Sequence, residues 1–413
     1  MSLYKHQLDI IRDDPKKCGL WLGTGSGKTL TALSLARGST LVICPKTQKE
    51  DRNWEREVEK NKLNIKLTTI SKETFRRDWE KLPKFDTVII DECHTSLGAT
   101  PNIRYRKKVA IPKASQIFEA IESYLQRHNP SRLYLCTATI VRNPMTVWAA
   151  SKLFGRGWDF YEFRNVFYVR LPMPGREVWT QRKDDKTKDR LAKAVRSLGY
   201  VGRIEEYVDM PDQIFKTIFL DLNLKQQKRI KELPLEYPDP IVLLGKKHQV
   251  ENGVLSGDEF NAPETFDNGK VDKILEYASE FPRMVIFAKY RAQIDEIQRA
   301  LTNEGYKTLT LTGDTADRGD VIKMANSMKE CIFIAQAQVS SGWELPDFPV
   351  MIFASLDWSI VNYVQAIGRI NRINNLKKNL YIHLVCKNSI DERVYRSVVE
   401  DKMDFHIAIF DKE

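Results

Sequence analysis

The sequence contains few cysteines, and their spacing matches neither a zinc site nor a disulfide framework. Six cysteines are spread over 413 residues, with no C-x-x-C pair and no cysteine–histidine cluster at zinc spacing. This pattern argues against a disulfide-stapled scaffold and against a zinc finger. Cys44, Cys136 and Cys386 end apolar runs, so we interpret the cysteines as buried thiols of a reducing compartment.

Long apolar runs are missing as well. No stretch approaches the ~20 apolar residues that a membrane-spanning helix needs, and the first residues show no signal-peptide core. Short-period repeats, a low-complexity tail and a helix-turn-helix pattern are also absent from the sequence. We therefore expect a soluble intracellular protein with no membrane partner and no module that reads base sequence.

The composition is that of an ordinary globular protein, with 42% hydrophobic and 29% charged residues. The length allows about two to three domains. The net charge of +10 favours a polyanionic partner such as nucleic acid, although a surplus of solvated lysines would give the same sum.

Short apolar runs alternate with helical patterns in two separate stretches of the chain. Strands that are apolar throughout, separated by helices, indicate a parallel sheet covered on both faces. We therefore predict an α/β fold with two parallel-sheet domains in tandem. The apolar runs are residues 41–44, 65–70, 88–90 and 133–136, then 284–287, 308–311, 332–334, 350–353 and 380–385.

The stretch between the two alternating regions is rich in aromatic and charged residues and does not follow the strand pattern. We interpret it as a small helical insertion at residues 155–210. The first domain then covers residues 1–154 and the second covers residues 211–413. Glycine, asparagine and proline mark residues 252–269 as a linker within the second domain.

A glycine-rich segment, GTGSGKT at 23–29, lies between a short apolar run and a predicted helix. This is the order of a phosphate-binding loop, in which backbone N–H groups and the helix N-terminus surround phosphate oxygens. Lys28 would reach the β- and γ-phosphates, and the Thr29 hydroxyl would bind Mg²⁺. Leu22 stands where the strict motif has its first glycine, so a merely flexible loop is the alternative. The expected backbone contacts to phosphate come from Gly25, Ser26 and Gly27.

The segment DECH at 91–94 directly follows a second apolar run. In a parallel sheet, the residue just past the end of a strand faces the ligand crevice. Asp91 could hold Mg²⁺ there, directly or through water, and Glu92 could orient and deprotonate an attacking water. An exposed acidic turn is the alternative, which the phosphate-binding loop upstream makes less favoured.

The order of motifs along the chain resembles that of superfamily 2 helicases, and the details resemble the Swi/Snf group of duplex-DNA translocases. The resemblance covers nearly the whole chain and implies two RecA-like domains that use ATP and Mg²⁺. The shared motifs are Gln7, GTGSGKT (23–29), VICPKT (42–47), DECH (91–94), TAT (137–139), VIFAKY (285–290), AQVSSGWELP (337–346) and QAIGRINR (365–372). The Swi/Snf-like segments are 44–60, 137–155, 356–373 and 388–403.

The resemblance also implies a role for individual residues. Gln7 would read the adenine edge, while Thr137 and Thr139 would couple hydrolysis to domain movement. From the second domain, Gly342 and Glu344 would face ATP and nucleic acid. The residues expected to complete the active site are Gln365, Arg369 and Arg372.

The two arginines have a physical reason to be there. A cation on the γ-phosphate stabilises the transition state of phosphoryl transfer and can contribute ~10³–10⁵ in rate. Arg369 and Arg372 are three residues apart, so we expect them to share one helix face. Arginines supplied by the second domain would make hydrolysis depend on domain closure. An exposed basic helix is the alternative.

Nucleic-acid contacts are expected from a basic run with an interleaved tyrosine after the DECH segment. We interpret it as a phosphate-contacting loop, with a solvated surface loop as the alternative. For His94 we consider a γ-phosphate sensor, a link to Thr137, or a polar core histidine. Residues 246–248 are interpreted as a solvated turn. The basic run contains Arg104, Arg106, Lys107, Lys108 and Lys113.

The departures from the family pattern limit the functional prediction. Ile140 stands where a proline usually follows the second threonine, and the region 150–280 is shorter than the insertions of the large chromatin remodellers. We therefore predict a compact phage or bacterial motor, cytoplasmic in the cell, rather than a nucleosome-handling protein. DNA, duplex or branched, is the expected partner, together with replication, recombination or repair proteins; a monomer is the default state.

Two other functions stay open. An RNA helicase of the same superfamily is one, although Trp54, Asn143 and Trp148 belong to Swi/Snf-like segments. A non-catalytic, ATP-gated DNA-binding adaptor is the other, although such a protein would be free to lose Lys28 and Glu92. A restriction-type motor is disfavoured because we find no additional carboxylate–lysine cluster that could form a nuclease.

Overall fold

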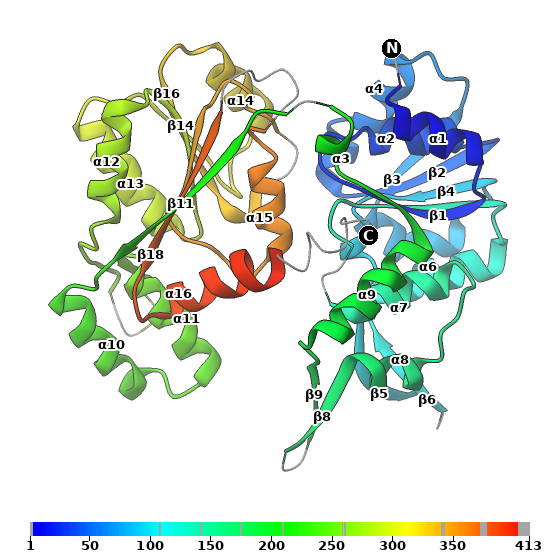
Figure 1. Cartoon of the computed structure of the whole chain (residues 1–413), viewed down its shortest axis with the longest axis horizontal. Helices are drawn as coiled ribbons and strands as arrows, with labels where there is room; N and C mark the ends of the chain where they lie inside the picture. The colour runs from blue at the N-terminus through cyan, green and yellow to red at the C-terminus, as the bar shows by residue number, and fades with distance from the viewer. Residues whose placement is uncertain are drawn as a thin grey trace. The chain divides into compact units, whose positions relative to one another are not determined.

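Two six-stranded parallel sheets organise the chain, one in each of two separate units (Figure 1). The computed structural model describes residues 3–106, 109–140, 143–173, 176–208, 210–257, 259, 262–339, 343–371 and 378–403. The first unit extends from Met1 to Val208, and the second begins at Asp209. This architecture confirms the predicted α/β fold with two RecA-like domains in tandem.

The sheet of the first unit has the strand order β10–β1–β7–β4–β2–β3, and every neighbouring pair is parallel. The segments that connect strands on the carboxyl side of the sheet therefore gather at one edge, where α/β proteins bind ligands. The strands are β1 (Lys17–Leu22), β2 (Ser39–Cys44), β3 (Lys66–Ser71), β4 (Thr87–Ile90), β7 (Arg132–Cys136) and β10 (Gly199–Gly202).

Both faces of this sheet are buried. Consecutive residues of a strand point to opposite faces, and both of two such neighbours lie in a hydrophobic core. Leu20 packs in a core with Ile10 and Trp54, whereas its neighbour Trp21 packs in another core with Phe118. The helices that cover the sheet are α1 (Lys5–Asp13), α2 (Lys28–Leu35), α3 (Lys46–Glu50), α4 (Asn53–Lys60), α5 (Lys72–Asp78), α6 (Gln116–His128) and α7 (Pro144–Leu153).

Residues 155–210, expected to be helical, are only partly so. They contain α8 (Phe160–Phe167), the hairpin of β8 (Tyr168–Met173) and β9 (Arg176–Gln181), and α9 (Asp185–Leu198). The segment then forms β10 in the main sheet. Leu191 and Val195 of α9 belong to the same core as Trp21, whose indole N–H donates to the Val195 carbonyl oxygen at 3.1 Å. A large part of the segment is thus integral to the first unit.

A pair of glycines lets β10 join the sheet. Gly199 lies opposite Gly19 of β1, and a β-carbon on Gly199 would lie 2.2 Å from the Gly19 carbonyl oxygen. The short sequence GYVG lacks an apolar run, because β10 is an edge strand with one neighbour. For this reason β10 was not predicted from the pattern of apolar residues in the sequence.

The sheet of the second unit has the order β11–β18–β17–β14–β16–β15 and is also parallel throughout. All five apolar runs predicted for this half form strands, and β11 is an additional edge strand. The strands are β11 (Gln213–Leu220), β14 (Arg283–Ala288), β15 (Thr308–Leu311), β16 (Cys331–Gln336), β17 (Val350–Phe353) and β18 (Asn379–Cys386).

Helices cover both faces of this second sheet (Figure 1). The predicted linker at 252–269 contains a short antiparallel pair, β12 (Val254–Leu255) and β13 (Glu264–Thr265). The helices are α10 (Leu224–Glu236), α11 (Pro240–Glu251), α12 (Lys270–Glu280), α13 (Arg291–Asn303), α14 (Arg318–Ser327), α15 (Ile360–Ile367) and α16 (Ile390–Tyr395), followed by a π-helical turn, Arg396–Lys402.

A buried polar network joins three of these helices. The Lys270 ammonium lies 2.8 Å from Asp391 Oδ2, 2.7 Å from Asn252 Oδ1 and 2.7 Å from the Ala354 carbonyl oxygen. His248 lies 3.2 Å from the other carboxylate oxygen of Asp391. Burial opposes ionisation of Asp391, but Lys270 and His248 hold its pKa well below the usual range. The interpretation of residues 246–248 as a solvated turn was therefore wrong for His248, which is buried in α11.

All six cysteines are buried free thiols, as predicted. Among the described residues, no helix has both the length and the apolar character needed to cross a membrane.

Candidate active site

The phosphate-binding loop connects β1 to α2, and its own lysine closes on it. Gly25 and Gly27 have left-handed backbones, with φ of 76° and 75°, a conformation that turns N–H groups toward a bound anion. The Lys28 ammonium donates to the carbonyl oxygens of Leu22 and Gly23, both at 2.9 Å. Phosphate oxygens are stronger acceptors than carbonyl oxygens, so the position of Lys28 is compatible with a switch to a phosphate.

The Ser26 side chain forms a hydrogen bond within the same loop. Its side chain is buried, and its hydroxyl donates to the Gly23 carbonyl oxygen at 2.6 Å. Ser26 is thus engaged within the loop through its side chain, while its backbone N–H is the group expected to contact phosphate.

Gln7 lies in α1 and contacts the same loop. Its Nε2 donates to the Gly27 carbonyl oxygen at 3.1 Å and to Thr31 Oγ1 at 3.2 Å, and its Oε1 accepts from the Tyr4 N–H at 2.9 Å. The side chain is buried. Gln7 therefore braces the start of α2, and its predicted contact with adenine stays a prediction.

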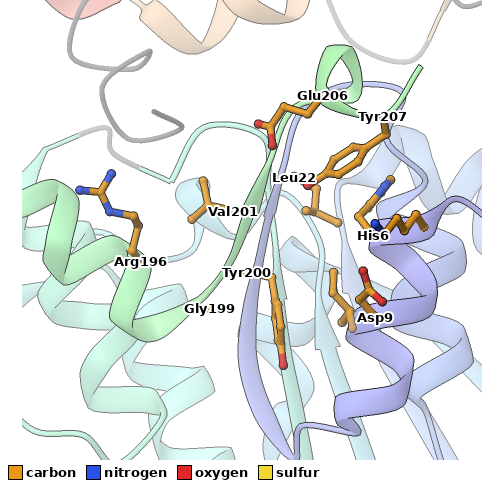
Figure 2. A pocket seen from close by; sticks show the side chains of 11 residues that line it. His6, Asp9, Leu22, Arg196, Gly199, Tyr200, Val201, Glu206 and Tyr207 are labelled. Carbon is orange, nitrogen blue, oxygen red and sulfur yellow. The ribbon is translucent and has the colours of Figure 1, made fainter. Parts of the chain in front are cut away.

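A cavity of about 570 Å³ lies beside α1, along β1 and β10. Figure 2 shows His6 and Tyr207 together in its wall, with Arg196 farther along the same cavity. The two rings stack with centroids 4.1 Å apart, and His6 Nε2 lies 2.9 Å from the Ser26 carbonyl oxygen. The cavity therefore adjoins the phosphate-binding loop, and its size suits a small organic ligand. Tyr207 lies outside every recognisable motif and was not predicted from the sequence.

Asp91 and Glu92 follow β4 directly, as predicted. Asp91 accepts a hydrogen bond from the Trp54 indole N–H at 3.2 Å and one from the Glu92 N–H at 2.9 Å. Burial and the adjacent Glu92 carboxylate raise the pKa of Asp91. Burial opposes ionisation of Glu92 as well, but His94 and the charges of Lys28 and Lys72 keep the pKa of Glu92 below its usual range. Glu92 is thus ionised at neutral pH, as a general base must be.

His94 and Thr137 hold the Glu92 carboxylate. His94 Nδ1 lies 2.8 Å from Thr137 Oγ1 and 3.3 Å from Glu92 Oε2. The Thr137 hydroxyl lies 3.4 Å from the same carboxylate oxygen and accepts from the Thr139 N–H at 3.1 Å. Of the three interpretations of His94, the structure thus favours the link between the DECH segment and Thr137.

Lys72 is a residue of the site that the sequence analysis missed. It is the first residue of α5, yet its side chain is buried and donates to the Glu92 carbonyl oxygen at 2.7 Å and to Thr95 Oγ1 at 2.6 Å. Burial lowers the pKa of Lys72, and the Asp91 and Glu92 carboxylates oppose that shift. No motif pointed to it, because a lysine that opens a helix is normally solvated.

The oxygen donors of the site fit Mg²⁺ bound together with phosphates. Thr29 lies in the first turn of α2 and contributes a hydroxyl, and Asp91 contributes a carboxylate. Mg²⁺ prefers such hard oxygen ligands and takes its remaining ones from water and substrate phosphates. No group of three or more metal-binding side chains occurs in the described part of the chain.

One of the residues predicted from the second unit, Arg369, forms hydrogen bonds with backbone atoms of that unit. Arg369 is buried, and its guanidinium donates to the carbonyl oxygens of Gln365 and Trp343 at 2.8 and 2.7 Å. The helix α15 ends at Ile367, so the expectation that the arginines share a helix face is wrong for Arg369, which lies in the following turn. Gln365 is buried and Glu344 is exposed. Their catalytic and nucleotide-binding roles stay predictions.

The described part of the basic run expected to contact nucleic acid lies in a β-hairpin. Its strands are β5 (Ala99–Arg106) and β6 (Val109–Ala114). Arg104 forms an ion pair with Glu119, whereas the neighbouring Tyr105 side chain is 73% exposed. The β5–β6 and β8–β9 hairpins lie side by side (Figure 1).

Several predicted residues lie wholly or partly outside the described residues. Of Arg106, only the backbone is described, as part of β5. The others are Lys107, Lys108, Gly342 and Arg372.

Comparisons with known proteins agree with the motif order. A family model described as "Helicase conserved C-terminal domain" matches residues 269–374. A "DEAD-box ATP-dependent RNA helicase 35B" of Oryza sativa subsp. japonica is 29% identical over 22% of this chain and 15% of its own length. A "Chromatin-remodeling ATPase INO80" of Gibberella zeae is 26% identical over 32% of this chain and 8% of its own length.

These matched relatives are much longer than the part of them that this chain covers. A solved structure, the "Sulfolobus solfataricus SWI2/SNF2 ATPase core in complex with dsDNA", is 17% identical and aligns with 99% of this chain and 93% of its own, with a TM-score of 0.41. The compact phage or bacterial type stays a prediction. The matched helicase domain and the chromatin-remodelling relatives confirm the resemblance that the motifs indicated: the chain is similar to Swi/Snf-like proteins of helicase superfamily 2.

Proposed function

We propose that the chain is a nucleic-acid-stimulated ATPase that moves along duplex or branched DNA. One observation carries the ATPase part: a closed phosphate-binding loop and an ionised Glu92 held by His94 and Thr137 occur in the same unit. A protein that only bound ATP would need the loop but not an oriented general base.

In the proposed reaction, Lys28 leaves the carbonyl oxygens of Leu22 and Gly23 and contacts the β- and γ-phosphates. Thr29 and Asp91 would hold Mg²⁺, which would supply positive charge to neutralise the phosphate oxygens. Glu92 accepts a proton from the attacking water, and His94 and Thr137 fix the direction in which its carboxylate points. Because Thr137 also accepts from the Thr139 N–H, a change at the carboxylate can reach the 137–139 segment that is proposed to couple hydrolysis to movement.

DNA is proposed as the polyanion for two reasons. The net charge of +10 favours nucleic acid. The Swi/Snf-like tryptophan, Trp54, donates its indole N–H to Asp91, which ties that group's characteristic segment to the proposed metal ligand. The helicase relative from rice supplies the alternative of an RNA substrate.

The test is the ATPase rate of the purified chain on single-stranded, duplex, forked and four-way DNA and on RNA. All rates are measured at matched salt, because phosphate contacts make affinity depend on salt. We expect the strongest stimulation with duplex or branched DNA. Stimulation by RNA alone would replace the DNA proposal with the RNA-helicase one. A chain that binds ATP but hydrolyses none would leave only the adaptor function.

A further inference from the structure

We propose that Lys72 is a positioning residue, which holds Glu92 in the backbone conformation that aims its carboxylate at the attacking water. The proposal rests on the ATPase function proposed above. It concerns a side chain that belongs to none of the motifs by which the site was found.

The location of Lys72 is unusual for a lysine. It follows β3, which is two strands away from β4 in the sheet order, and its side chain extends to the turn that follows β4. Its ammonium donates to the Glu92 carbonyl oxygen and to the Thr95 hydroxyl. The side chain is only 9% exposed. Lys72 thus contacts the backbone of the general base from outside the DECH segment.

The backbone that Lys72 contacts is strained. Glu92 has φ of 43° and ψ of 49°, the left-handed conformation, which is unfavourable for a non-glycine residue. This conformation places the carboxylate within 3.3 Å of His94 and 3.4 Å of Thr137. A donor on the Glu92 carbonyl oxygen fixes the orientation of that peptide group and therefore the direction of the side chain.

Lys72 is not needed to satisfy this turn. The Glu92 carbonyl oxygen also accepts from the Thr95 N–H at 3.1 Å and from the Thr95 hydroxyl at 3.0 Å. Removing the ammonium therefore leaves neither of its two partners without a hydrogen bond. The turn can still form, but with one fewer constraint on the Glu92 peptide.

The charge of Lys72 is costly for the fold. No ion pair within 4.0 Å involves Lys72 among the described residues; Asp91 and Glu92 favour its charged form only at longer range. Burying a cation without a close partner is costly, and an apolar side chain of similar size removes that cost. A lysine buried at that cost, in contact with the general base, points to a role in turnover rather than in stability.

The experiment compares Lys72→Met with wild type in three measurements: the turnover number, the ATP dissociation constant and the melting temperature. Methionine keeps most of the length and removes the donor. We expect kcat to fall by about 10–100-fold, as for other losses of orientation at a reacting centre, while ATP affinity changes less than about twofold and the melting temperature is unchanged or higher. Arg76→Met, an exposed cation removed from the same helix, serves as the control and should behave as wild type.

Two further variants make the result specific. Lys72→Arg restores a cationic donor and should recover part of the lost turnover. In a Glu92→Gln background, Lys72→Met should add no further loss, because residues that act through one another are not additive. Wild-type turnover in Lys72→Met would overturn the proposal, and so would losses of turnover, ATP affinity and melting temperature together. If wild type itself hydrolyses no more ATP than Glu92→Gln, the proposed ATPase function fails first, and this outcome is distinct from both.

Discussion

At Gly27, an added β-carbon would meet both backbone strain and the side chain of Gln7. The residue has φ of 75°, and an added β-carbon would lie 2.4 Å from Gln7 Nε2. An alanine at this position would therefore suffer both backbone strain and a steric clash with Gln7. Gln7 in turn anchors α1 to the loop, so the two residues depend on each other.

Gly27→Ala is expected to abolish nucleotide binding, measured by titration with a fluorescent ATP analogue. The matched control is Gly155→Ala, where φ is 70° but nothing lies within 4 Å of the added β-carbon. That control should lose about 1 kcal/mol of stability from strain alone and keep nucleotide affinity. Equal binding by both variants would show that Gln7 does not restrict the loop.

His383 predicts a pH dependence of stability in the second unit. It is buried, lies 3.0 Å from the Tyr363 hydroxyl and has its pKa lowered to about 4 by burial. Between about pH 4 and 6.5 the unfolded chain binds a proton that the folded chain does not. Stability is therefore lost as the pH falls through this window, by about 2 kcal/mol at about pH 5 for this one group.

The measurement is urea unfolding of wild type and His383→Phe at neutral pH and at about pH 5. Phenylalanine does not titrate and can stack on Phe353 as His383 does. The variant should show a weaker loss of stability on acidification. A slope equal to that of wild type would assign the pH dependence to other groups.

The residues that sequence reasoning found and missed differ in a physical way. Lys28, Asp91 and Glu92 could be predicted because their chemistry needs fixed types of residue beside a strand end. Lys72 and His248 could not, since their burial depends on neighbours that lie far away in sequence. Arg369 was found as a motif residue, but its bonds to backbone carbonyl oxygens have no sequence signal.

At the scale of elements, the network around Lys270 holds α11, α12 and α16 together. Asp391 Oδ2 accepts from Lys270 and also from the Cys386 N–H at 3.0 Å, which links α16 to the end of β18. Breaking one partner of a buried ion pair leaves an uncompensated charge and costs more than removing both.

Asp391→Asn should therefore destabilise the chain by about 3–5 kcal/mol, measured by chemical denaturation. Adding Lys270→Met to it should restore much of the loss, because the unpaired ammonium is then gone. If the double variant were no more stable than the single one, the cost would lie in the lost packing of α16 and not in the charge.

Element type could be predicted wherever a strand is buried on both faces. Runs such as residues 350–353 are apolar because β17 lies inside the sheet. The two edge strands escaped the prediction: β10 has no apolar run, and β11 has an exposed Phe215 within a mixed pattern. The hairpin β8–β9 was missed for a related reason, since it belongs to neither sheet.

At the scale of the whole molecule, the main difference from the prediction is the C-terminal boundary of the first unit. The predicted first domain stops at residue 154, whereas the compact unit extends to Val208 and its sheet includes β10. Without residues 155–208, Trp21 would lose its core partners Leu191 and Val195.

A fragment of residues 1–208 should therefore unfold cooperatively on heating, followed by circular dichroism. A fragment of residues 1–154 should be insoluble or lack a cooperative transition, because an apolar face and the β1 edge are uncovered. Cooperative unfolding of the shorter fragment would instead make residues 155–208 an accessory insertion.

The central claim is that Glu92, held by His94 and Thr137, activates water for ATP hydrolysis. The most direct measurement is the steady-state ATPase rate of wild type and Glu92→Gln with duplex DNA, at equal ATP occupancy of the two proteins. The variant keeps the size of the side chain and should bind ATP normally, while its rate falls by at least ~10²-fold. A Glu92→Gln protein that hydrolyses ATP at the wild-type rate would contradict the account.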